Sequence, residues 1–188
     1  MQSILYRLVA LASGCALNWN AGNQLCSMLA ARSLIETVAS LHSFEKELRP
    51  ALESEDLAKL NELTLHHSFA TKDKRMLDEH IGFEATNVLT LVDKLERQFE
   101  IDGLRDGYDR LSERCHPNAA GHYFFFGMLD PETGTITYAE TKNSDHNLNI
   151  VLGACLLLGL ANSSLAHLDE LIRTIADLQD RLRPIPEN

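Results

Sequence analysis

Apolar residues recur every three or four positions along most of this 188-residue chain. This spacing places them on one face of an α-helix, so the pattern predicts a series of amphipathic helices. Long amphipathic helices joined by short loops pack as antiparallel neighbours, which favours a helical bundle. The expected helices lie, in chain order, at residues 4–17, 25–49, 55–69, 88–99, 108–116 and 145–178.

Two helix ends are indicated by individual residues. The second helix is expected to stop at Arg49-Pro50, because proline restricts the residue before it and lacks a backbone N–H. Ser54 resembles the N-cap of the third helix, since acidic Glu55 and Asp56 follow where the helix dipole favours negative charge. The mixed, charged segment 71–82 is expected to be a connection with one helical turn.

The pattern changes to one typical of strands near residue 122. Tyr123–Phe126 and Thr135–Tyr138 are rich in aromatic and β-branched residues, and Asp130–Gly134 has the proline and glycine of a turn. We therefore expect a β-hairpin inserted at about residues 122–140. A lone hairpin is only marginally stable, so its apolar face must pack on the helices or on a second subunit.

Ser144 and Asp145 are expected to cap the last helix, which Pro184 ends. Its most apolar stretch, Val151–Ala161, is shorter than the ~20 residues that a membrane span needs. We interpret it as the fully buried centre of a helix and expect no membrane span. The prediction for residues 1–188 is a single, mainly α domain, a multi-helix bundle with one inserted β-hairpin.

Charge and absent motifs exclude several classes of protein. The net charge of −10 argues against broad DNA binding, which needs a concentrated positive surface, and favours an acidic cytoplasmic protein. No glycine-rich phosphate loop, GxSxG or HExxH motif is present, which disfavours a nucleotide-binding α/β sheet, a serine hydrolase and a metalloprotease.

The four cysteines form no close pair of the CxxC type, which disfavours a zinc site. They are Cys15, Cys26, Cys115 and Cys155, and we expect buried free thiols, no metal and no cofactor. The N-terminal stretch from Arg7 to Cys15 fits an amphipathic helix. A weak alternative is a lipoprotein signal with Cys15 as the lipidated residue.

The main candidate site lies where a helix ends at His116-Pro117-Asn118. Tyr108, Ser112 and His116 recur at four-residue spacing and share a helix face. Arg110 could hold a phosphate bidentately, and His116 could move a proton because histidine titrates near neutrality. This pairing suits cleavage of RNA through its 2′-hydroxyl. The alternative is a helix-capping histidine followed by a turn.

A second candidate is the pair Arg32 and Glu36, four residues apart on an otherwise apolar helix. Such residues can pair, and the pair could reach into a site or be an ordinary salt bridge at the surface. We expect them to support the residues around Arg110 and His116.

These two segments resemble bacterial helical-bundle families of unknown function that are distantly similar to the HEPN superfamily. The resemblance rests on Arg32–Glu36 and Tyr108–His116 and spans roughly residues 20 to 120. It implies a helical, often dimeric protein, with many members acting as RNases of toxin or defence systems. Their active motif is an arginine followed, a few residues later, by a histidine near a dimer interface, which points to Arg110 and His116. The residue after the arginine, usually polar in active members, is Leu111 here.

Two other functions remain open from the residues alone. The aromatic hairpin could form the surface of a non-enzymatic, dimeric interaction module. Alternatively, the helices could enclose a pocket for a small ligand, whose identity the sequence does not indicate.

Overall fold

The computed structural model describes residues 2–79, 82–139 and 145–182. It is mainly α-helical with a small β-hairpin, which confirms the predicted fold class. The elements are α1 (Gln2–Asn20), α2 (Gln24–Glu53), α3 (Leu57–Phe69), β1 (Ala70–Thr71), α4 (Lys74–Asp78), β2 (Phe83–Glu84), α5 (Val88–Phe99), α6 (Leu104–Cys115), α7 (Ala119–Phe126), β3 (Gly127–Leu129), β4 (Ile136–Tyr138), α8 (Asp145–Leu156) and α9 (Leu158–Leu182).

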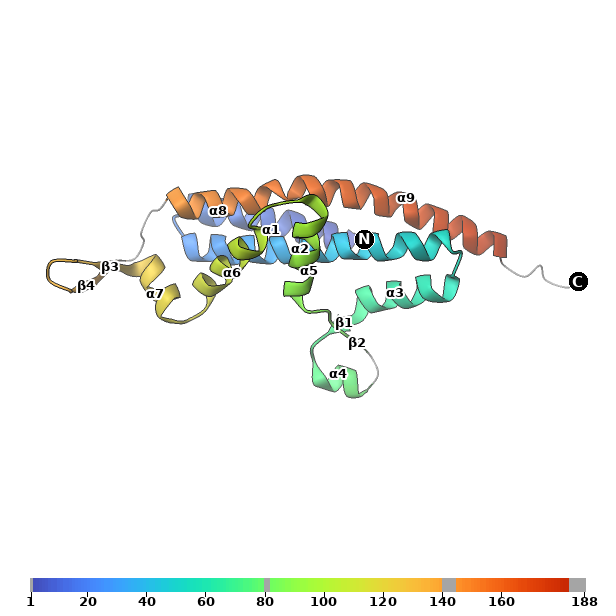
Figure 1. Ribbon diagram of the computed structural model, residues 1–188, viewed down its shortest axis with the longest axis horizontal. Coiled ribbons are helices and arrows are strands. Elements are labelled where there is room, and N and C mark those ends of the chain that lie inside the picture. The colour runs from blue at the N-terminus through green and yellow to red at the C-terminus, as the bar shows by residue number, and fades with distance from the viewer. Residues whose placement is uncertain (1, 80–81, 140–144, 183–188) are drawn as a thin grey trace, which may run out of the picture.

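Helix α2 is the centre of the molecule. It contacts α1, α3, α5, α6, α8 and α9, and the long helices α1, α2, α8 and α9 run along the long axis (Figure 1). Fifteen of its 30 residues are buried, because other helices cover it on most sides. Six of the buried residues are polar or charged: Gln24, Ser27, Thr37, His42, Ser43 and Glu45. Burying such groups is costly unless they are hydrogen bonded, so each needs a partner, either on α2 itself or on a neighbouring element.

The predicted boundary between the second and third helices is wrong. Helix α2 continues through Pro50 to Glu53, because the burial of Leu48 and Ala51 on either side of the proline outweighs the hydrogen bond that the proline removes. Ser54 ends α2 instead of starting α3, and its N–H donates to the Pro50 carbonyl. Asp56 is the N-cap of α3, where its carboxylate accepts the Lys59 N–H at 2.9 Å.

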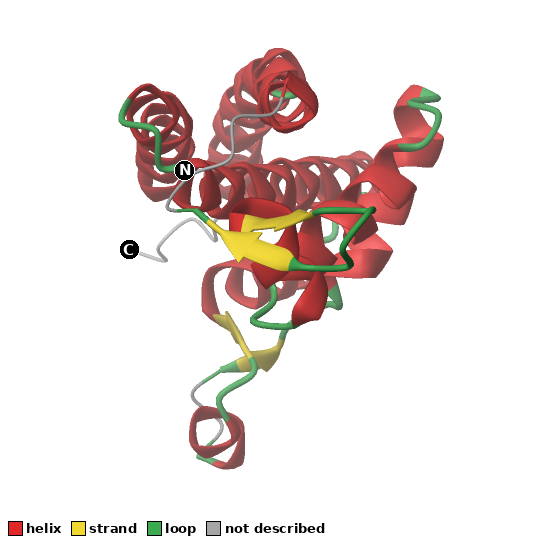
Figure 2. Ribbon diagram, turned by 90° about the vertical axis from the view of Figure 1, so that its left-hand side faces the viewer, coloured by secondary structure: helices red, strands yellow, loops and turns green. Residues whose placement is uncertain are grey.

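The predicted first strand at Tyr123–Phe126 is also wrong, because these residues form the end of helix α7. Asn118 caps this helix and Phe125, only 3% exposed, packs into the core, so capping and burial override the strand propensity of the aromatic run. The hairpin itself is present but shorter, with antiparallel β3 and β4 paired at Met128 and Thr137. Figure 1 shows the hairpin projecting beyond one end of the helices, and Figure 2 shows its two strands from that end.

The last predicted helix consists of two helices, α8 and α9, which are separated at Leu157. Asp145 begins α8, and Ser144 lies outside the described residues. The stretch Val151–Ala161 is not buried all round, since Leu156 is 79% exposed and Leu152 is about half exposed. Helices α8 and α9 pack against α2 with one face, and apolar side chains on the other face, such as Leu152 and Leu156, are exposed.

Within the described residues, one segment has the length and composition of a membrane span. This is Asp145–Leu182, and 28% of its most apolar window is buried in the molecule. The finding differs from the expectation that no segment is long enough. It is weak evidence, because a core helix of a soluble protein can meet the same criteria.

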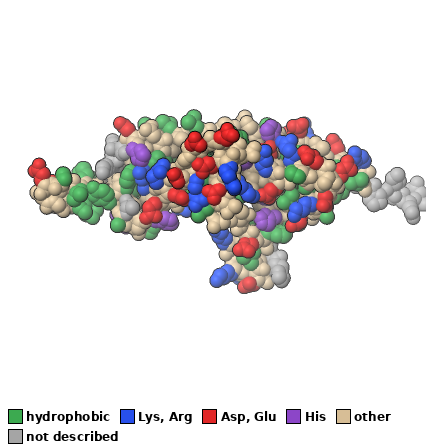
Figure 3. Space-filling view, in the orientation of Figure 1, with side chains coloured by type: hydrophobic (Ala, Val, Ile, Leu, Met, Phe, Trp, Pro, Cys, Tyr) green, Lys and Arg blue, Asp and Glu red, His purple; other side chains and the backbone are tan. Residues whose placement is uncertain are grey.

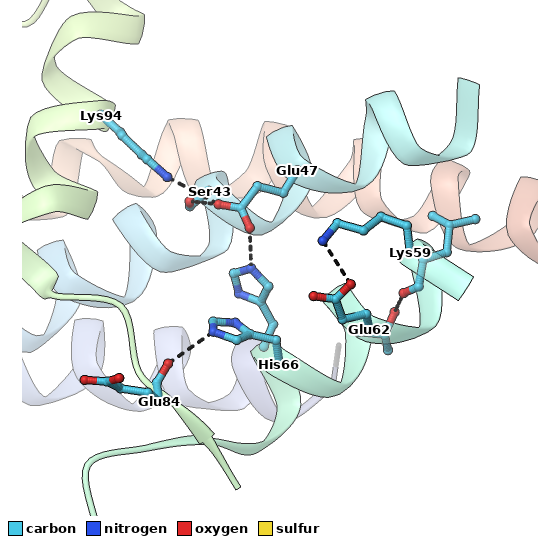
Figure 4. Close-up of polar contacts among 10 residues, drawn as sticks. Ser43, Glu47, Lys59, Glu62, His66, Glu84 and Lys94 are labelled. Atoms are coloured by element: carbon cyan, nitrogen blue, oxygen red, sulfur yellow. Dashed lines mark hydrogen bonds and ion pairs between the residues drawn. The ribbon is translucent and has the colours of Figure 1, made fainter. Parts of the chain in front are cut away.

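The segment between α3 and α5 contains the one predicted helical turn, α4, and a short parallel pairing of β1 with β2 that was not predicted. Figure 4 shows the side chain of His66 on α3 pointing to Glu84 on β2. The His66 Nε2 donates to the Glu84 carbonyl at 3.1 Å, which ties this segment to α3.

Helix α1 corresponds to the predicted N-terminal helix and includes all of its residues; Met1 lies outside the described residues. Leu8 and Cys15 are buried, and the Cys15 carbonyl accepts the Ser27 hydroxyl at 2.8 Å. All four cysteines are free, as predicted, but only Cys15 is fully buried. Burial and the nearby Cys155 raise the pKa of Cys15 to about 12, so it is held as a neutral thiol.

Candidate functional site

The predicted pair Arg32–Glu36 forms on α2, and a residue from α6 joins it. The Arg32 Nε donates to Glu36 Oε1 at 3.1 Å. The Tyr108 hydroxyl donates to the same oxygen at 2.6 Å, from a side chain that is only 1% exposed. The guanidinium also lies 6.0 Å from the centre of the Tyr108 ring, within reach of a cation–π contact. These three residues, the α2–α6 polar cluster, therefore connect the two segments singled out in the sequence.

The surroundings of Arg32 and Tyr108 keep each of these two side chains in one protonation state. Burial, together with the hydrogen bond to Glu36, raises the pKa of Tyr108, so the hydroxyl stays a neutral donor. Burial alone would lower the pKa of Arg32, but its contacts with Tyr108 and Glu36 outweigh burial and raise it. The cluster thus has a permanent cation, and its tyrosine remains protonated at neutral pH.

Ser112 and Cys115 extend the same face of α6 beyond Tyr108. Ser112 is half-buried, and so is Cys115. Burial raises the pKa of the Cys115 thiol, and the charges of Arg32 and Glu36 lie near enough to influence it. Cys115 therefore borders the α2–α6 polar cluster, and its thiol is a poor nucleophile there.

Arg110 and His116 are placed differently. Arg110 is exposed and lies two residues after Tyr108, which turns it about 200° around α6, away from Glu36. His116 is the C-cap of α6, where its N–H donates to the Glu113 carbonyl at 3.3 Å and its side chain is exposed. In the described part of the chain neither side chain has a hydrogen-bond or ion-pair partner. The structure therefore brings Tyr108 to Arg32 and Glu36, but does not bring Arg110 or His116 to them.

The turn that follows His116 is held by Asn118. The Asn118 N–H donates to the His116 carbonyl at 2.8 Å, and its side-chain amide donates to Glu113 Oε1 at 2.5 Å. Its side-chain oxygen accepts the Gly121 N–H at 2.9 Å and so starts α7. At Gly121 an added Cβ would lie 2.2 Å from the His116 carbonyl oxygen, so only glycine fits. His116 is therefore presented to solvent from a closely packed turn.

Replacing Gly121 by alanine is expected to lower the free energy of unfolding by about 1–3 kcal/mol, because the methyl group must displace backbone at His116. Chemical denaturation measures this change. A matched control is Gly107→Ala on α6, where an added Cβ meets no atom within 4 Å. That substitution is expected to stabilise by about 0.5–1 kcal/mol, since alanine favours a helix interior. Equal effects of the two substitutions would contradict the packing at Gly121.

Another arginine of α6, Arg114, lies one helical turn after Arg110. Its guanidinium sits 3.7 Å from the centre of the Phe124 ring, and Nη2 donates to His146 Nε2 at 3.0 Å. Its Nη1 is buried and, among the described residues, has no hydrogen-bond partner. Burial and the charge of Arg110 lower the pKa of Arg114. The four-residue spacing of the two arginines was visible in the sequence, but the contacts with α7 and α8 were not.

Within the ranges that the structure describes, no group of three or more His, Cys, Asp or Glu side chains is placed to hold a metal ion. The polar residues gathered at α6 are instead arginines, a tyrosine and histidines. Groups of this kind bind anions and transfer protons.

Comparison with known proteins found no family model, no curated protein and no solved structure that matches this chain. Its function is therefore argued from its own residues.

Proposed function

We propose that this chain is a cytoplasmic, HEPN-like protein that binds and cleaves RNA and acts in a toxin or defence system. The observation that carries the proposal is the hydrogen bond from Tyr108 to Glu36. It joins the two helices whose residues carry the resemblance to the HEPN superfamily. Packing alone could place these helices side by side in many registers, but this contact sets one of them.

The phosphate-binding part of the proposal rests on the arginines of α6. Arg110 is exposed and Arg114 lies near enough for their charges to interact, so two cations face the same side of α6 in a protein of net charge −10. The exposed Arg110 guanidinium has no hydrogen-bond or ion-pair partner among the described residues, so it can donate to phosphate oxygens, and Arg114 adds positive charge beside it. Phe124, in contact with Arg114, adds an aromatic surface, and bases of single-stranded RNA stack on such rings.

The proposed reaction uses the 2′-hydroxyl of the RNA as the nucleophile. His116 accepts the proton of the 2′-hydroxyl, and the 2′-oxygen forms a bond to phosphorus while the bond from phosphorus to the 5′-oxygen breaks. The leaving 5′-oxygen takes up a proton from solvent water, which gives a 2′,3′-cyclic phosphate and a 5′-hydroxyl, and His116 returns its proton to solvent. Arg110 stabilises the negative charge that develops on the phosphate oxygens. Arg32, Glu36 and Tyr108 are positioning residues that hold α6, with Ser112 on the same face.

The proposal is tested with a labelled single-stranded RNA and a DNA of the same sequence, each incubated with the purified chain. We expect cleavage of the RNA and an intact DNA, since only RNA has the attacking hydroxyl. Cleavage of both strands would contradict the mechanism, and two intact strands would contradict the activity.

A second function, a dimeric interaction module, is favoured by the hairpin. Its strands expose large apolar side chains, and three of them, Leu129, Ile136 and Tyr138, lie on the same face of the hairpin. In Figure 3 hydrophobic atoms gather at the end of the molecule where the hairpin projects. A monomer gains nothing from apolar side chains in this position, so we propose that they bind a second copy of the chain.

Replacing Ile136 by aspartate is expected to convert the proposed dimer to monomers, because a charge would be buried in its apolar interface. Gel filtration with light scattering measures the molecular mass. Thr137→Asp is the matched control, since adjacent strand residues point to opposite faces of the hairpin. Phe125, although aromatic, is not suitable for this test, because it is buried in the core. A monomeric parent chain, or a dimer that Ile136→Asp leaves intact, would contradict the interface.

A further inference from the structure

A hollow on the surface between α2 and α5 has properties that the proposed RNA site does not use. Its volume is about 350 Å³, and its lining includes His42, Lys46 and Glu47 from α2 and Lys94 and Arg97 from α5. His42 lies ten residues after Arg32, or about 15 Å further along α2. The hollow is therefore distinct from the α2–α6 polar cluster.

The positive charge in the hollow exceeds the negative charge. Figure 4 shows Ser43 and Lys94 pointing to Glu47, the carboxylate in its lining. Glu47 accepts hydrogen bonds from Ser43 at 2.8 Å, from His67 at 3.1 Å and from Lys94 at 3.3 Å. Its carboxylate is therefore paired with these groups and not with the other cations of the hollow. Lys46 and Arg97 have no ion-pair partner within the described ranges; the Arg97 Nε donates only to the Asp93 carbonyl. An anion would neutralise them.

His42, in the lining of the hollow, is only 5% exposed, and its ring packs 4.7 Å from the ring of Phe99. Its Nδ1 lies 3.3 Å from the Ser164 hydroxyl oxygen. That hydroxyl donates its proton to Glu45 at 2.9 Å, so it can only accept from His42. The proton of the neutral ring therefore sits on Nδ1, and Nε2 carries a lone pair.

This lone pair is unsatisfied, since His42 Nε2 is buried and no described group hydrogen bonds to it. The ring stays neutral because burial lowers its pKa, and the charge of Lys46 acts in the same direction against that of Glu45. Ser164 is not a nucleophile activated by this histidine, because it is 2% exposed and its proton faces Glu45. A buried acceptor without a donor costs free energy, which a ligand with a suitable O–H would recover.

We propose that this hollow binds a phosphate group, as inorganic phosphate or on a small phosphate ester, with Lys46, Lys94 and Arg97 around its oxygens and His42 Nε2 accepting from its P–OH. Phosphate combines two properties that the lining requires. It is an anion that suits several cations, and near neutral pH it carries an ionisable proton. A fully deprotonated anion would place an oxygen lone pair against that of Nε2.

Isothermal titration calorimetry with inorganic phosphate at pH 7 tests this site, with sulfate as the comparison because it has similar shape and charge but no proton. We expect phosphate to bind at least about tenfold more tightly than sulfate, the equivalent of one hydrogen bond to a charged group. In ¹⁵N NMR the Nε2 signal of His42 should shift when phosphate is added. Absence of binding, or equal binding of the two anions, would overturn the proposal.

Two variants locate the binding. Lys46→Gln removes an exposed cation from the hollow, so the fold should survive and phosphate affinity should fall by about tenfold, as for loss of one charge-assisted hydrogen bond. Lys74→Gln makes the same change on α4, outside the lining, and should leave the affinity unchanged. Equal losses of phosphate affinity in the two variants would mean that the affinity depends only on the net charge of the protein, and the site would be rejected.

Discussion

Replacing His116 by alanine is expected to slow RNA cleavage by about 10²–10⁴-fold, the usual contribution of a positioned acid–base group. The fold should be unaffected, because His116 caps α6 with its backbone and its side chain is exposed. The measurement is the single-turnover rate on a labelled RNA, together with thermal unfolding of each variant.

His122→Ala is the matched control for this substitution. His122 is also exposed and lies one turn into α7, but the proposed reaction does not use it. Its rate should stay within about twofold of the parent, which is small beside the effect of a positioned acid–base group. Equal cleavage by the parent and His116→Ala, or no cleavage by either, would reject His116 as the catalytic base.

Replacing Tyr108 by alanine is expected to lower the free energy of unfolding by about 3–5 kcal/mol, as for other large aromatic residues in a core. Tyr108 is among the largest fully buried side chains, and its loss would also leave the Glu36 carboxylate with one donor fewer. Urea denaturation measures the change.

Tyr108→Phe separates the hydrogen bond from the packing of the ring. It keeps the ring and removes only the hydroxyl, so the expected loss is about 1.5–3 kcal/mol, the range for hydrogen bonds to charged groups. If Tyr108→Phe is as stable as the parent, the hydroxyl does not hold α6 against α2, and the α2–α6 polar cluster loses its proposed role.

Three polar residues of α2 share a structural role. Gln24 accepts from Asn147 on α8, Glu36 from Tyr108 on α6, and Glu45 from Ser164 on α9. Apolar contacts are non-directional, whereas each of these hydrogen bonds has one geometry. We infer that they set the register of the surrounding helices, and two of them lie next to the proposed sites.

The helices could be predicted because their apolar residues repeat with helical spacing, and the end of α6 was marked by His116 and Pro117. The strand expected at Tyr123–Phe126 was wrong, because the cap at Asn118 and the burial of Phe125 depend on tertiary packing. Pro50 was over-interpreted for a related reason, since the burial of Leu48 and Ala51 around it also depends on tertiary packing.

The candidate site was predicted only in part. The pair Arg32–Glu36 follows from its four-residue spacing, and the face shared by Tyr108 and Ser112 follows in the same way. That spacing does not predict which helix Tyr108 contacts. Contacts between distant segments, such as Arg114 with His146 or His42 with Ser164, required the folded chain.

The central claim is that this chain cleaves RNA through the 2′-hydroxyl at the end of α6. The most direct test is to determine the ends of the products after a labelled RNA is incubated with the purified chain. The account predicts a 2′,3′-cyclic phosphate on one product and a 5′-hydroxyl on the other. A 3′-hydroxyl with a 5′-phosphate, or an RNA that stays intact, would contradict it.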